Sequence, residues 1–150
     1  MATKRVTAYD PAHVHSGAPT SGQAANLDNG ILVAVDSSGN LRPADYRVSQ
    51  AVGLEARGFL VESCELKDPK GNVLSTQPRI SYTRNGRVGG MSASGGGALL
   101  KGKTYYLFTG GDIVPYPPAA AQNDINQVVG YAETTDVLVI SIGAAAYLQL

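Results

Sequence analysis

The chain has few of the residues that usually carry out catalysis or bind metals. Its 150 residues include one cysteine, two histidines and no tryptophan. The single cysteine, Cys64, excludes an internal disulfide, and the neighbouring Glu62 and Glu65 do not favour a reactive thiolate. Both histidines lie in a segment rich in proline and glycine, where a Ser-His-Asp site would lack a rigid support. We therefore expect a protein that is not an enzyme and uses no cofactor.

Charge is also scarce. Only 16% of the residues are charged, and twelve basic residues balance twelve acidic ones. Such a chain generates no net field that would attract nucleic acid or an anionic membrane. No run approaches the ~20 apolar residues that span a bilayer, and the first residues lack the apolar run of a signal peptide. We expect folding in a reducing cytoplasm, with no nucleic acid, membrane or small-molecule substrate as a partner.

Glycine and proline are frequent, whereas long segments of helical periodicity are missing. The 18 glycines and 8 prolines suit many turns and few helices. Apolar or alternating strands are separated by turn signals such as Asn29-Gly30 and Asn85-Gly86. Five apolar residues in a row, Ile31–Val35, predict a strand covered on both faces. The predicted class is all-β, with a single compact β-barrel or β-sandwich domain.

Composition divides the chain into three regions. Residues 1–26 offer little apolar surface and predict an extended N-terminal arm that is ordered only against a partner. Residues 27–150 form the β domain. Within it, residues 67–97 contain turn-rich hairpins and the glycine-rich segment 89–97, which predicts a mobile loop. We interpret residues 67–97 as an insertion.

One pattern occurs twice, on either side of this insertion. The first copy starts with strand 31–35, passes through a polar turn and residues 41–43, and closes at 51–56. The second copy starts with strand 105–108, passes through a glycine turn, and closes at 128–133. Repeated β units bury a common core. We expect two similar units in one barrel-like domain, which favours a scaffold or binding module over a catalytic cleft.

The second copy carries a family resemblance. The segment Leu100-Lys101-Gly102-Lys103-Thr104-Tyr105-Tyr106-Leu107, the turn at 110–114, and strands 127–132 and 137–140 resemble capsid cement, or head decoration, proteins of tailed bacteriophages. This resemblance implies a β-tulip-like domain without catalytic residues. It also implies a homotrimer, made in the bacterial cytoplasm, that binds the outer capsid surface of the virion and bridges major capsid protein subunits.

Under this resemblance, the N-terminal arm is the candidate capsid contact. Extended segments give large contact areas, and an edge strand can pair with a strand of a partner. We expect residues 3–20 to anchor the protein to the shell. The candidate contact residues are Thr3, Arg5, Thr7, Tyr9, Pro11, His13 and His15.

Aromatic residues of the second copy are candidates for the oligomer interface. Tyr105 and Tyr106 alternate along a strand, so at most one of them belongs to a given surface. The core or a subunit interface is the expected location of such a cluster. The candidate interface residues are Tyr105, Phe108, Tyr116 and Tyr131.

The pair His13 and His15 is the one motif with possible metal geometry. In an extended segment the two side chains would project to the same side. Two imidazoles are too few to hold a transition metal, so we predict no metal site and two solvent-facing histidines. In a trimer, three copies of the pair around an axis would supply six nitrogens.

A second function also fits these features. A carbohydrate- or receptor-binding module of a phage tail or spike would use exposed tyrosines to contact its ligand. An exposed aromatic platform with Asp or Asn beside it would distinguish this module from a cement protein.

Overall fold

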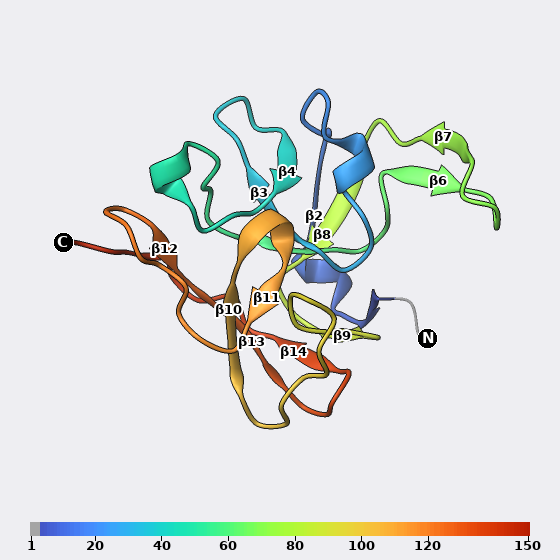
Figure 1. Cartoon of the computed structure of the whole chain (residues 1–150). Helices are drawn as coiled ribbons and strands as arrows, with labels where there is room; N and C mark the ends of the chain where they lie inside the picture. The colour runs from blue at the N-terminus through green and yellow to red at the C-terminus, as the bar shows by residue number, and fades with distance from the viewer. Residues whose placement is uncertain (1–3) are drawn as a thin grey trace.

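Short antiparallel strands make up most of the chain (Figure 1), in a computed structural model that describes residues 4–150. Helical structure in this range is limited to four single 3-10 turns: η1 (Pro11–His13), η2 (Ala24–Asn26), η3 (Val48–Gln50) and η4 (Thr109–Gly111). The predicted all-β class is confirmed. No helix between residues 4 and 150 has the length and apolar character needed to cross a membrane.

The strands form two large sheets and two small ones. The six-stranded sheet contains, in spatial order, β1 (Arg5–Ala8), β9 (Arg87–Gly89), β14 (Leu138–Ile140), β13 (Val128–Ala132), β10 (Thr104–Leu107) and β11 (Ile113–Val114). The five-stranded sheet contains β2 (Val14–Gly17), β8 (Ile80–Thr83), β5 (Gly58–Leu60), β3 (Leu32–Val35) and β4 (Leu41–Pro43). The small sheets pair β6 (Glu65–Lys67) with β7 (Val73–Thr76), and β12 (Ile125–Asn126) with β15 (Ala146–Tyr147). Both large sheets are open within the described residues, so no closed barrel forms there.

The repeated sequence pattern corresponds to a repeated strand order. β3 lies between its hairpin partner β4 and β5, and β10 lies between its hairpin partner β11 and β13. Each copy therefore lies at the edge of a different sheet. The closing strand of the second copy is β13, as predicted. Residues 51–54 of the first copy are not a strand, because they form a loop with one bridge between Asp45 and Leu54, and β5 pairs with β3 instead.

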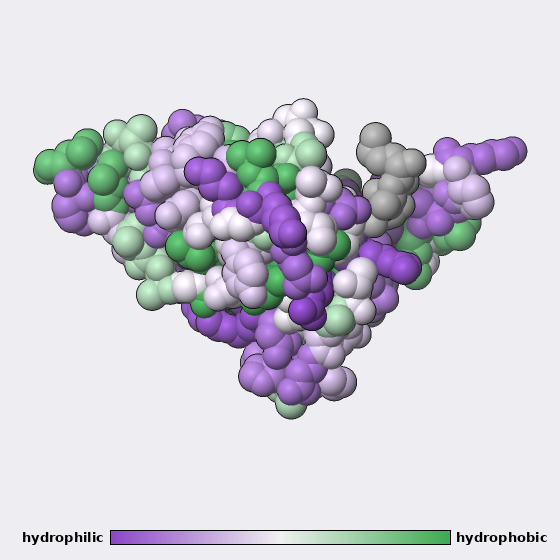
Figure 2. Space-filling model, turned by 90° about the horizontal axis from the view of Figure 1, so that it is seen from below, coloured by the Kyte–Doolittle hydropathy of each residue, from purple (hydrophilic) through white to green (hydrophobic). Residues whose placement is uncertain are grey.

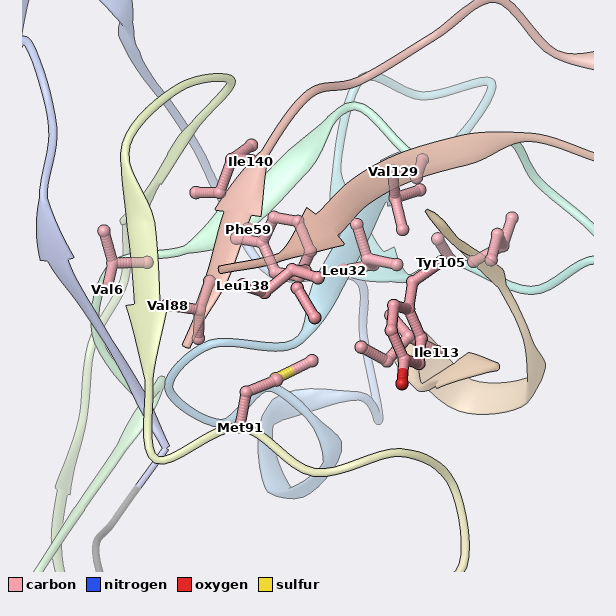
Figure 3. Close-up of a cluster of buried hydrophobic side chains, with 14 of the residues drawn as sticks. Val6, Leu32, Phe59, Val88, Met91, Tyr105, Ile113, Val129, Leu138 and Ile140 are labelled. Carbon is pink, nitrogen blue, oxygen red and sulfur yellow. The ribbon is translucent and has the colours of Figure 1, made fainter. Parts of the chain in front are cut away.

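The two large sheets face each other across one hydrophobic core (Figure 3). Leu32, Ala34 and Phe59 enter this core from the five-stranded sheet. Val88, Tyr105, Leu107, Val129, Leu138 and Ile140 enter it from the six-stranded sheet. Burial of each large apolar side chain contributes roughly 1.5–3 kcal/mol, so this contact between sheets holds the domain together.

The opposite face of the five-stranded sheet has a second, smaller core. Val33 belongs to it, whereas its neighbours Leu32 and Ala34 belong to the first core, because side chains alternate along a strand. The other members of the second core are Leu27, Ile31, Leu41, Leu60, Cys64 and Ile80. The predicted two-sided burial of this strand is therefore confirmed.

The N-terminal residues complete both large sheets, which differs from the predicted separate arm over residues 1–26. β1 pairs with β9 and places Val6 in the first core, and β2 pairs with β8. The segment supplies few apolar side chains, but its backbone N–H and C=O groups satisfy strands that would otherwise be exposed edges. Backbone pairing leaves no mark on composition, and composition was the basis for predicting an arm.

Residues 67–97 also belong to the sheets and are not an insertion. β8 lies between β2 and β5, and β9 lies between β1 and β14. The glycine-rich loop that follows β9 is held in place, because Met91 is buried in the first core and its N–H donates to Asp136 O at 2.9 Å. The β6–β7 hairpin projects from the body of the molecule (Figure 1).

Truncation of Leu32 tests the two-sided burial of β3. Leu32 is fully buried, so we expect Leu32→Ala to lower the free energy of unfolding by about 2–5 kcal/mol. The matched control is Leu74→Ala on β7, where the side chain is 69% exposed, with a change within about 0.5 kcal/mol. Urea unfolding followed by circular dichroism measures both, and equal losses would contradict this core.

The turn between β8 and β9 tests the docking of the N-terminal strands. Gly86 has φ +108°, and a Cβ there would overlap the carbonyl oxygen of Ala8. Gly71 has φ +88° with open space around it. We expect Gly86→Ala to destabilise the protein by about 2–4 kcal/mol and Gly71→Ala by about 1 kcal/mol. Equal effects in urea unfolding would show that Ala8 does not lie against this turn.

Candidate interaction surfaces

The predicted capsid-contact residues lie at the surface, with one outside the described residues. Thr3 falls before residue 4, where the description begins. The other six members are exposed, on β1, β2 and the η1 connection between them: Arg5, Thr7, Tyr9, Pro11, His13 and His15. On β1, Arg5 and Thr7 alternate with the buried Val6. We call these six residues the N-terminal surface.

The two histidines of this surface do not share one strand. His13 ends η1 and its Nε2 lies 3.8 Å from a carboxylate oxygen of Asp10, whereas His15 belongs to β2 and stacks on Tyr82 at 5.5 Å between ring centroids. The strand alternation that would align their side chains therefore does not apply. Among the described residues, no three His, Cys, Asp or Glu side chains are grouped so as to hold a metal ion.

The predicted aromatic interface divides into buried and exposed members. Tyr105 is fully buried in the first core, and its hydroxyl accepts a hydrogen bond from Leu100 N at 2.8 Å. This corrects its assignment to an oligomer interface, since the inward face of β10 was not distinguishable from the outward face by sequence. Phe108 is half-buried and stacks on Tyr46 at 5.5 Å. Tyr116 and Tyr131 are about half exposed.

Tyr131 stands in a row across the outer face of the six-stranded sheet. Pairing register places it beside Thr104 on β10 and Val139 on β14, and Val139 beside Arg87 on β9. Arg87 Nε donates to Glu133 at 3.0 Å, an exposed ion pair of small energetic value. This row mixes one aromatic, one aliphatic and polar side chains, so this part of the sheet face is neither purely apolar nor strongly charged.

The β6–β7 hairpin carries three exposed apolar side chains. Leu66, Val73 and Leu74 are 43%, 50% and 69% exposed, and every residue of β7 is exposed. Figure 2 shows hydrophobic residues at the surface on the side where this hairpin projects, and again at the opposite end, near the C-terminus. An isolated two-stranded hairpin is only marginally stable in water, and exposed apolar clusters mark contact sites.

Two aspartates in turns, Asp36 and Asp68, bind the backbone of their own turns. Asp36 accepts from Ser38 N and Asn40 N, and Asp68 accepts from Lys70 N and Asn72 N, each at 2.9 Å. The Asn40 N–H, helped by the Thr20 hydroxyl, lowers the pKa of Asp36, and Asn72 lowers the pKa of Asp68 in the same way. These carboxylates are structural and have no free oxygen set aside for chemistry.

A groove with charged walls lies between the N-terminal segment, β4 and η4. Its volume is about 490 Å³. The charged residues along it are Lys4, Asp28, Arg42, Asp45, Arg47 and Asp112. We call it the charged groove. No sequence motif marks these residues, because they come from four separate stretches of the chain.

Asp45 and Arg47 form the ordered part of this groove. Asp45 Oδ1 accepts from Arg47 Nε at 2.9 Å, and Oδ2 accepts from Arg47 Nη2 at 2.8 Å and from Gly110 N at 3.0 Å. Burial by itself raises the pKa of Asp45, but the Arg47 side chain, the Arg47 N–H and the Gly110 N–H together outweigh burial and lower that pKa. The bidentate pair therefore fixes the loop after β4 to η4.

Two further buried polar side chains, Gln127 and Asp124, hold loops in place through hydrogen bonds. Composition did not reveal this role. Gln127 bonds both the N–H and the C=O of Ala56 and also donates to Gly143 O, at 2.7–3.0 Å. Asp124 accepts from Ser49 N at 3.0 Å and from its hydroxyl at 2.6 Å. Cys64 is buried, and burial raises the pKa of its thiol, so it is a core residue and not a nucleophile.

Comparison with known proteins relates the fold to a bacteriophage protein. The chain matches no family model and no curated protein sequence. A solved chain from Mycobacterium phage Patience has a similar structure, with a TM-score of 0.63 and 12% sequence identity. The similarity covers 95% of this chain and 97% of that one. The two chains therefore share a fold over essentially their whole lengths.

The Asp45–Arg47 pair predicts a specific pH dependence of stability. Since folding lowers the pKa of Asp45 below its ordinary value of 3.8, its contribution is complete above that value and is lost as pH falls through the lower folded value. We expect Asp45→Asn to destabilise the protein by about 1–3 kcal/mol at pH 7. The difference from the wild type should shrink in urea titrations as the pH falls from 5 to 2. A difference that stays constant would contradict the ion pair.

Proposed function

We propose that this chain is a capsid decoration protein that binds the outer surface of an icosahedral phage head. One observation carries the proposal: the fold extends over the whole length of a chain from Mycobacterium phage Patience. The resemblance of strands 100–107, 127–132 and 137–140 to cement proteins supports it independently. The proposed partner is the major capsid protein, whose neighbouring subunits it would bridge, and the proposed location is the virion.

The distribution of exposed groups supports a binding role spread over several elements. The N-terminal surface presents β1 at the edge of the six-stranded sheet and β2 at the edge of the five-stranded sheet. An edge strand can accept a strand of a partner through backbone hydrogen bonds. The apolar β6–β7 hairpin offers a second contact. On a shell, many copies of such weak contacts would add up through avidity.

The proposed assembly is a homotrimer without catalytic activity, cofactor or metal. Tyr116 and Tyr131, together with the exposed part of Phe108, remain the proposed oligomer contacts, whereas Tyr105 is excluded by its burial. Of the four most exposed tyrosines, Tyr131 lies on β13, Tyr147 lies on β15, and Tyr9 and Tyr116 lie in connections. None of these four belongs to a stacked aromatic pair in the described part of the chain.

Deletion of residues 1–20 is not a clean test, because it would remove β1 and β2 from the sheets. Point substitutions on the exposed face of β1 leave Val6 in place. We expect Arg5→Glu with Thr7→Glu to weaken co-sedimentation with expanded heads of the encoding phage at least about tenfold, since a like-charge or desolvation mismatch costs at least 1.4 kcal/mol.

The control is Lys101→Glu with Ala98→Glu, which makes the same charge change at exposed positions elsewhere. It should bind as the wild type does. Light scattering should give a mass of about three times the 15.6 kDa chain. A monomer that does not bind heads would contradict the proposal and redirect attention to receptor or sugar binding. Equal weakening by the control pair would show that the N-terminal surface is not the contact.

A further inference from the structure

The charged groove contains two cations whose side chains form no hydrogen bond in the described part of the chain, although the charge of Arg42 contributes to the lowered pKa of Asp36. No hydrogen bond or ion pair within residues 4–150 involves the side chain of Lys4 or Arg42. Arg42 Nε is, in addition, buried from solvent with no acceptor. A buried charged donor without an acceptor is unfavourable, and most such groups are satisfied in folded proteins.

The position of Arg42 explains why its Nε is shielded. Arg42 lies on edge strand β4 opposite Ala34, which belongs to the first core. The aliphatic stem of the side chain therefore covers the margin of the core, as long basic side chains often do. Arg47 lies in the same groove, and each of its three guanidinium nitrogens donates a hydrogen bond. The missing acceptor is therefore a property of Arg42 and Lys4 and not of the groove as a whole.

Neighbouring elements hold these two cations in place. The Lys4 stem packs on Gly30, where a Cβ would lie 2.7 Å from Lys4 Cγ, so a larger residue there would displace it. Gly30 has φ +73°, a conformation that favours glycine. Asp45 ties the loop after β4 to Gly110 on the other wall of the groove. A site with such fixed walls loses little conformational freedom when it binds.

We propose that the charged groove is a carboxylate-binding site that receives an Asp or Glu side chain from an extended segment of the major capsid protein. The identity of that donor rests on the proposed function, whereas the carboxylate chemistry does not. A guanidinium and an ammonium along one groove complement a carboxylate. Asp28 and Asp112 also line the groove, and their charges disfavour polyanions such as nucleic acid more strongly than a single acidic side chain.

The first test is a titration of the isolated protein followed by nuclear magnetic resonance. Shielding of Arg42 Nε slows exchange of its proton with water, so its resonance is observable. We expect a saturable shift of that resonance with N-acetylglutamate N-methylamide. The neutral N-acetylglutamine N-methylamide should cause none. No shift with the glutamate compound, an equal shift with the glutamine compound, or a stronger response to inorganic phosphate would each overturn the site.

Substitutions test which residues of the groove bind the glutamate compound. Arg42→Gln should weaken binding of the glutamate compound about tenfold or more, as measured on the backbone amide of Gly110, because it removes charge-assisted hydrogen bonds. Lys4→Gln should weaken it as well, and Lys101→Gln, at an exposed position outside the groove, should leave it unchanged. Unchanged binding by the Arg42 variant would overturn the proposal.

The same variants separate this inference from the proposed function. If the site is correct, Arg42→Gln should reduce co-sedimentation with expanded heads, while Lys101→Gln should not. Normal head binding by Arg42→Gln, together with an intact shift in the wild type, would overturn the capsid protein as carboxylate donor. Absence of head binding by the wild-type protein would instead contradict the proposed function. The titration with the glutamate compound would then decide by itself whether the groove binds a carboxylate.

Discussion

The structure depends on the burial of β3 on both of its faces. A strand with Leu32 and Ala34 on one side and Val33 on the other needs two covers. The six-stranded sheet is one cover, and the segment from Leu27 to Ile31 helps to form the other. The two sequence repeats lie in two different sheets and do not join in one barrel within the described residues.

Polar side chains then hold the connections that the apolar core cannot. Asp45, Asp124 and Gln127 are buried, and each binds backbone groups of a segment distant in sequence. Such groups satisfy buried loop amides that have no strand to pair with. Asp45 also orders one wall of the charged groove, where each guanidinium nitrogen of Arg47 donates a hydrogen bond and Arg42 Nε donates none. This one carboxylate thus stabilises the fold and shapes the groove.

The surface divides into a body with few exposed apolar groups and projections that carry them. The β6–β7 hairpin has Leu74 as its most exposed apolar side chain and packs little against the core. β1 and β2 leave sheet edges free at the N-terminal surface. A protein that binds a large assembly through many weak contacts can distribute them over such elements, whereas a catalytic site requires them to converge.

The sequence by itself determined the all-β class, the turns at Asp36 and Asp68, and the two-sided burial of β3, because these depend on local turn chemistry and on apolar periodicity. Tertiary structure alone decided that residues 5–17 belong to the sheets, that Tyr105 faces the core, and that Lys4 and Arg42 share a groove. Strand pairing joins backbone groups of distant segments, and neither its register nor the groove between those segments leaves a local sequence signal.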